Sequence, residues 1–156
     1  MKSIFILCFV LYNLFLFSQH KHSHYVGEEK RSIKALSDDD IKSLKEGEGM
    51  GLAKAAELNH YPGPKHVLEI ADVLKITDEQ KISIQAIYKM MNENAVRVGN
   101  EIISKEKELD SLFANNVIDE QALKTKTEEI GKLQGELRSV HLSAHIRSEE
   151  HTSELQ

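Results

Sequence analysis

The pattern of apolar positions predicts one long amphipathic helix from residue 80 to about residue 113. Apolar residues recur there mostly three or four positions apart, which is the spacing of a single helix face. The segment contains no Pro, and Gly99 is its only Gly. At about 1.5 Å per residue the helix would be roughly 50 Å long. Its apolar stripe consists of Ile84, Ile87, Met91, Ala95, Val98, Ile102, Leu109 and Phe113. One helix cannot bury this stripe alone, so other segments must cover it.

A capping box precedes this helix. Thr77 and Gln80 are three residues apart, so each side chain can bond the other residue's backbone N–H. Asp78 and Glu79 place negative charge at the positive end of the helix dipole. We therefore expect Thr77 and Gln80 to start the helix and to bind no ligand.

A second long helix is predicted after a short turn at Asn115 and Asn116. Asp119 is its expected N-cap. Its apolar face comprises Leu123, Ile130, Leu133, Leu137, Val140 and Ala144. So short a connection makes the two helices antiparallel neighbours.

Shorter helices are predicted before the hairpin. Ser37 caps a helix that carries three Asp in its first turn and ends near Gly47. Residues 50–58 form an Ala-rich helix, residues 59–64 break the pattern with two Pro around a Gly, and residues 66–74 resume it. We expect an all-α domain over residues 37–146: a long antiparallel hairpin with short N-terminal helices. Homodimerisation through the long helices would bury more of both apolar faces.

The N-terminal residues 1–18 are predicted to be a cleavable secretory signal peptide. Lys2 precedes an almost unbroken apolar run, and Ser18 is a small residue at the expected cleavage site. The alternative is an uncleaved membrane anchor, but the run is shorter than the ~17–25 residues that a spanning helix needs. Cys8 lies in this segment and is the only Cys of the chain, so we expect no disulfide and no thiolate chemistry after cleavage.

Residues 19–36 form a polar tail with His20, His22 and His24 in alternation. Alternating His in a tail can bind Zn²⁺ or Cu²⁺ weakly. The alternative is a solvated segment without a ligand.

The last ten residues, 147–156, match the translation of a sequencing adapter. The oligonucleotide AGATCGGAAGAGCACACGTCTGAACTCCAG encodes these residues in order. We therefore expect that the natural frame was interrupted near Ile146 and that residues 147–156 are an artefact. His151 accordingly takes no part in the functional argument.

Composition narrows the classes of function. The formal net charge is −5, and no basic patch indicates a nucleic-acid partner. The sequence has no HExxH motif, no nucleophile elbow and no phosphate-binding Gly loop. We expect a non-enzymatic protein without an organic cofactor.

One His pair is the strongest candidate for chemistry. His141 and His145 are four residues apart on the second long helix, so both rings project from one face and can share a metal ion. Neutral imidazoles can bind Zn²⁺, Ni²⁺, Co²⁺ or Cu²⁺. Two ligands make an incomplete site, and His66 with Glu69 are the nearest complement, with His60 a further candidate. The alternative is that the pair lies on an ordinary helix surface or interface.

The residues Ile76-Thr77-Asp78-Glu79-Gln80 resemble the LTxxQ motif of the Spy/CpxP group of small periplasmic helical proteins. The likeness spans roughly residues 24 to 146. Its most specific part is Tyr61-Pro62-Gly63-Pro64, with further similarity over 49–53, 56–59, 66–69 and 133–145. These segments resemble the heavy-metal sensor and resistance branch of that group, which includes CnrX-like and ZraP-like proteins. Group members typically carry a second LTxxQ box, which would lie beyond Ile146.

The resemblance implies a periplasmic four-helix hairpin subunit, commonly dimeric, with one of two activities. The first is metal binding coupled to an envelope stress or metal-resistance circuit, with a membrane sensor or regulator as partner. The second is ATP-independent holding of unfolded envelope proteins, for which the stripe residues Ile84, Ile87, Met91, Val98 and Ile102 are candidates. Client-binding members tend to have a basic cradle, whereas this chain is acidic. We therefore favour the metal-responsive function and keep the holdase as the alternative.

Overall fold

The computed structural model describes residues 25–152 and divides the chain into two units, residues 1–30 and 31–156. The described part of the first unit contains one 3₁₀ turn, η1 (Glu28–Lys30). The predicted signal peptide and His20, His22 and His24 lie outside the described residues. Everything below concerns the second unit.

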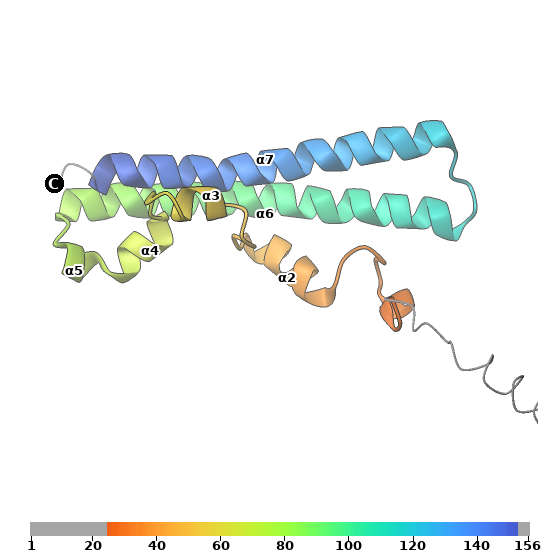
Figure 1. Ribbon diagram of the computed structural model, residues 1–156, viewed down its shortest axis with the longest axis horizontal. Coiled ribbons are helices and arrows are strands. Elements are labelled where there is room, and N and C mark those ends of the chain that lie inside the picture. The colour runs from red at the N-terminus through yellow and green to blue at the C-terminus, as the bar shows by residue number, and fades with distance from the viewer. Residues whose placement is uncertain (1–24, 153–156) are drawn as a thin grey trace, which may run out of the picture. The chain divides into compact units, whose positions relative to one another are not determined.

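Two long helices, α6 (Asp78–Ala114) and α7 (Glu120–Thr152), form an antiparallel hairpin (Figure 1). Ion pairs fix their alignment: Arg97 contacts Glu136 at 2.7 Å, and Lys105 contacts Glu129 at 3.1 Å. Regular structure within residues 25–152 is entirely helical apart from one isolated bridge. The predicted all-α hairpin is confirmed.

Both predicted caps of the hairpin helices are present. The Thr77 hydroxyl accepts a hydrogen bond from the Gln80 N–H at 3.2 Å, and the Gln80 side-chain oxygen accepts one from the Thr77 N–H at 2.8 Å. Asp119 accepts from the Ala122 N–H at 2.7 Å. These side chains satisfy backbone donors that the first helical turn leaves without partners.

The helices before the hairpin are α2 (Asp38–Glu46), α3 (Lys54–Glu57), α4 (Pro64–Glu69) and α5 (Ala71–Leu74). The Ser37 cap and the stop at Gly47 are confirmed. The helix predicted over 50–58 is shorter, because Met50 and Gly51 have φ of 47° and 74° and form a turn instead. The helix predicted over 66–74 is divided at Ile70, whose φ of −114° is not helical.

Helix α2 crosses α6 at Gly99. A Cβ atom at this position would overlap the Leu44 carbonyl, so the close backbone approach requires glycine. Around the crossing lies the main apolar cluster, formed by Leu44, Ala95, Val98, Ile102 and Leu137.

The N-terminal boundary of the folded unit lies earlier than predicted. Ile33 is 4% exposed, and the Lys34 N–H donates to an Asp110 carboxylate oxygen at 3.2 Å. Residues 33 and 34 of the predicted polar tail therefore already contact the folded unit. A single apolar residue carries too little periodicity to reveal such docking from the sequence.

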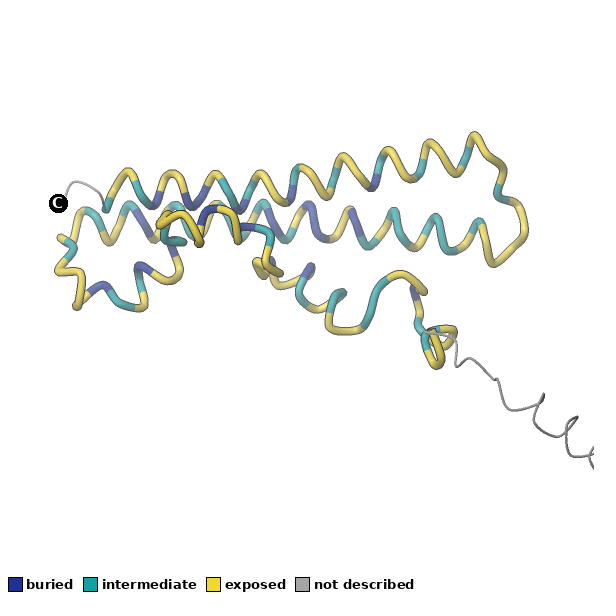
Figure 2. The backbone as a smooth tube through the Cα atoms, viewed as in Figure 1, coloured by how far each residue is buried: buried dark blue, intermediate teal, exposed yellow. Residues whose placement is uncertain are grey.

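Burial differs sharply along the hairpin (Figure 2). We call residues 78–102 and 130–152 the base, and residues 103–129 the tip. The base holds every buried residue of α6 and α7, and the tip holds none. Stripe residues Ile84, Val98 and Ile102 are buried, whereas Ile87 and Met91 are half-buried. Ile84, Val98 and Ile102 are therefore core residues in this structure, and Ile87 and Met91 are the candidates for client binding that remain partly accessible.

Helix α7 continues through residues 147–152, which the adapter match predicts to be foreign to the natural chain. The segment has no Pro or Gly to stop the helix, and the Ser148 side chain is buried in the base.

Among the helices within residues 25–152, none combines the length and apolar character needed to cross a bilayer.

Candidate metal site

A groove in the base brings the predicted metal ligands together. The segment from the end of α2 to α4 lines one side of the groove, and residues of α6 and α7 line the other. His141, His145, His66 and Glu69 all line this groove, as does His60. The four residues singled out from sequence therefore share one surface, although they come from two elements far apart in the chain.

The ring of His145 is held by the segment Tyr61-Pro62-Gly63-Pro64. Its Nδ1 lies 2.8 Å from the Tyr61 carbonyl oxygen. Because a carbonyl can only accept, Nδ1 carries the proton and Nε2 carries the lone pair in the neutral ring. A Cβ on Gly63 would lie 2.9 Å from ring atoms of His145. Glycine at position 63 thus lets the segment approach the imidazole.

His141 is 3% exposed, and its Nε2 has no hydrogen-bond partner. Burial lowers the pKa of His141, and the nearby His145 lowers it further. The ring is therefore neutral near pH 7. A buried imidazole nitrogen without a protein partner is unusual and calls for an explanation such as an ion or a water molecule.

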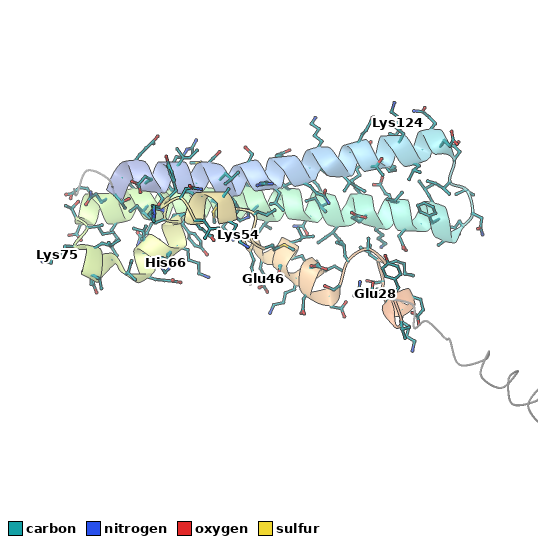
Figure 3. All side chains as sticks on the ribbon, viewed as in Figure 1. Glu28, Glu46, Lys54, His66, Lys75 and Lys124 are labelled. Carbon is teal, nitrogen blue, oxygen red and sulfur yellow. The ribbon has the colours of Figure 1, made fainter. Side chains whose placement is uncertain are left out.

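His66 and Glu69 line the groove from α4 and are exposed; Figure 3 labels His66 on this helix. His66 Nδ1 lies 3.4 Å from a Glu69 carboxylate oxygen, and their side chains are 70% and 56% exposed. Within residues 25–152, no group of three or more His, Cys, Asp or Glu side chains is already close enough to hold an ion. His66 and Glu69 would have to change rotamer to join His141 and His145.

The structure adds residues that sequence reasoning did not assign to the site. A Glu57 carboxylate oxygen lies 3.9 Å from His145 Nε2. The Tyr61 carbonyl and Gly63 contact the same ring. The Tyr-Pro-Gly-Pro segment can be identified in the sequence as a helix breaker. Its contact with α7 joins residues 84 positions apart, and a local sequence pattern cannot predict such a contact.

The capping residues play no part in this groove. Thr77 and Gln80 bond each other's backbone, and the Gln80 amide nitrogen also donates to the His151 carbonyl at 2.9 Å. Their role is structural, as predicted.

Comparisons with protein families, with curated proteins and with solved structures find no match for this chain.

Proposed function

We propose that the protein is a periplasmic metal-responsive binding protein of the heavy-metal sensor or resistance type, linked to envelope stress. His141 and His145 are the metal ligands in this proposal. The observation that carries it is the His141 Nε2 atom, which is buried without a partner in the wall of a groove that His145 also lines.

The His145 tautomer supports the same proposal. Histidines that bind metals commonly donate their other ring N–H to a carbonyl or carboxylate, which orients the ring. The Tyr61 carbonyl does this for His145 at 2.8 Å. In this proposal, Nε2 of each imidazole binds the same ion. Because burial keeps His141 neutral, a cation need not displace a proton from it.

His66 and Glu69 are the proposed additional ligands when the ion is Zn²⁺, Ni²⁺ or Co²⁺, which take nitrogen and oxygen donors. Their exposed side chains are free to reorient toward the groove. Metal occupancy would then link α4 to α7. Such a link is a change that a membrane sensor or regulator could detect, and this is the partner we propose.

Metal titration by calorimetry tests the proposal. The chain should be prepared without a polyhistidine tag and titrated with Zn²⁺, Ni²⁺, Co²⁺ and Cu²⁺. We expect the double variant His141→Ala/His145→Ala to lose the tightest binding step. A matched control, His20→Ala/His22→Ala/His24→Ala, separates weak binding by the tail and should retain that step.

Equal millimolar binding by the unaltered chain and by the His141→Ala/His145→Ala variant would refute the proposal. Circular dichroism of every variant is needed, because both rings are buried in the base.

Fractionation of cells that produce the chain should place it in the periplasm, and sedimentation should report the homodimer that we propose from the long helices.

A holdase activity is the second candidate, and a different observation favours it. Ile87 and Met91 line a shallow apolar hollow with Val140 and Ala144. Apolar hollows of this kind can bind exposed hydrophobic segments of unfolded proteins. Suppression of aggregation of a denatured client, with and without metal, tests the activity. Ile87→Ser should reduce it, whereas Ile82→Ser, at an exposed position outside the hollow, should not. No suppression at stoichiometric amounts would exclude this candidate.

A further inference from the structure

The groove also contains a sulfur donor on α6. Met91 lines the groove together with His141 and His145. The same residue borders the hollow on the other side, where its neighbours on α7 are Val140 and Ala144. Met91 therefore lies level with the turn of α7 that carries both imidazoles. The Met91 residue is half-buried.

One polar atom of this constellation lacks a partner. His141 Nε2 has no hydrogen-bond partner and lies on a side chain that is only 3% exposed. His145 is oriented by its bond to the Tyr61 carbonyl, which leaves Nε2 as the donor atom toward a ligand. The side chains of His141, His145 and Met91 thus line one groove.

We propose that this groove is a Cu(I) site in which the Met91 thioether joins the imidazoles of His141 and His145, an inference that rests on the proposed function and narrows its metal. Thioether sulfur is a soft ligand of the kind that selects Cu(I), whereas the usual protein ligands of Zn²⁺ are thiolate, imidazole and carboxylate groups. The ion is bound as Cu(I), and the site performs no redox step.

The chain supplies a matched control one residue away. Met90 borders only the hollow and lies outside the groove. Its side chain is 50% exposed. Leucine retains most of the volume of methionine but removes the sulfur, so Met91→Leu and Met90→Leu differ mainly in which thioether is lost.

Cu(I) affinity should be measured without oxygen, by competition with a chromogenic Cu(I) chelator. We expect Met91→Leu to weaken Cu(I) binding about tenfold or more. Mutation of a residue that only hydrogen-bonds a metal ligand already lowers metal affinity about 10–100-fold, and Met91 is proposed to bind the ion directly. Met90→Leu should bind Cu(I) with the same affinity as the unaltered chain. Zn²⁺ affinity should be the same in both variants. X-ray absorption at the copper edge should show sulfur scattering in the unaltered chain and in Met90→Leu, but not in Met91→Leu.

Unchanged Cu(I) affinity in Met91→Leu, with the sulfur signal retained, would overturn this inference. If His141→Ala/His145→Ala still abolished metal binding, the proposed function would survive that result. If the unaltered chain bound none of Cu(I), Cu²⁺, Zn²⁺, Ni²⁺ and Co²⁺, the proposed function and this inference would both fail. Circular dichroism and thermal unfolding of Met91→Leu would show whether the fold is intact, so that a loss of affinity can be attributed to the sulfur.

Discussion

In the base of the hairpin, Ile84, Val98 and Ile102 of α6 are buried against the rest of the fold, whereas between Ile103 and Glu129 no residue is buried. The tip instead carries an ion-pair cluster. Lys126 contacts Glu108 at 2.6 Å and Glu129 at 3.2 Å, and Lys105 contacts the same two carboxylates. One pair of continuous helices therefore joins two regions that are held together by different forces.

The difference has consequences for stability and for function. Each fully buried apolar side chain contributes about 1.5–3 kcal/mol relative to an exposed one, whereas exposed ion pairs contribute little and weaken in salt. The short helices α2 to α5 cover the base and not the tip, which is why the groove with His141 and His145 lies in the base. A ligand site that needs oriented side chains gains from the more rigid region.

The largest effect should come from opening a cavity in the base. Ile84 is 0% exposed, so Ile84→Ala should lower the free energy of unfolding by about 2–5 kcal/mol. Phe113→Ala in the tip, where the ring is 53% exposed, should change it by no more than about 0.5 kcal/mol. Urea denaturation followed by circular dichroism measures both. Similar losses would mean that the tip is buried in solution, so that the proposed homodimer would form through the tip of the hairpin.

Two Gly→Ala variants separate the effect of close packing on stability from the effect of helix propensity. Gly99→Ala should lower the free energy of unfolding by about 1–3 kcal/mol, since the added methyl overlaps the Leu44 carbonyl where α2 crosses α6. Gly131→Ala on α7 meets no atom within 4 Å and should stabilise the helix by up to about 1 kcal/mol. Thermal unfolding compares the two variants. A stabilising Gly99→Ala would show that α2 is not held tightly against α6.

Two Thr→Ala variants compare the contribution of the α6 cap to stability with that of a threonine in the tip. Thr77→Ala removes the cap of α6 and should lower the free energy of unfolding by about 1 kcal/mol. Thr127 in the tip bonds only carbonyls of its own helix, Leu123 and Lys124 at 3.0 Å, so Thr127→Ala should have little effect. Chemical denaturation of both variants under one condition is the measurement. A larger loss for Thr127→Ala would contradict the assignment of Thr77 as the structural cap.

The smallest effect is expected from the charges of the tip, and it should depend on pH. Hydrogen bonding from Lys126 lowers the pKa of Glu108, and bonding from Lys105 and Lys126 lowers the pKa of Glu129. A carboxylate whose pKa is lower in the folded state stabilises that state above its unfolded pKa. This contribution disappears as the pH falls through the folded pKa.

Hydrogen exchange, corrected for the intrinsic rate, should therefore show the tip losing protection as the pH falls below the unfolded pKa of Glu108 and Glu129. Protection around His141 in the base should begin to decrease at a higher pH than this, because burial lowers the pKa of that ring and its protonation opposes folding. Lys126→Gln should reduce the pH dependence in the tip and leave protection around Val98 unchanged. Added salt should act in the same direction as Lys126→Gln. Simultaneous loss of protection in base and tip would show that the hairpin opens as one cooperative unit.

Local chemistry accounts for the features that the amino-acid sequence predicts correctly. Caps such as Ser37-Asp40 and Thr77-Gln80 involve residues three positions apart, and apolar periodicity needs only one helix. The hairpin follows from a short turn between two such helices. Sequence spacing also places His141 and His145 on one helix face, which makes them candidate metal ligands. His66 and Glu69 are the nearest residues that could complete such a site.

Contacts between distant segments were decided only by the tertiary structure. Nothing local indicates that Ile33 docks, that Ile70 divides a helix, or that Ile84 and Val98 are buried while Met91 is only half-buried. The orientation of His145 likewise depends on Tyr61 and Gly63, which reach it from a distant part of the chain. Periodicity identifies an apolar face, but the neighbour that covers each residue is selected by packing across the whole chain. The sequence by itself therefore determined the helices and the His pair, and tertiary packing determined the groove that surrounds them.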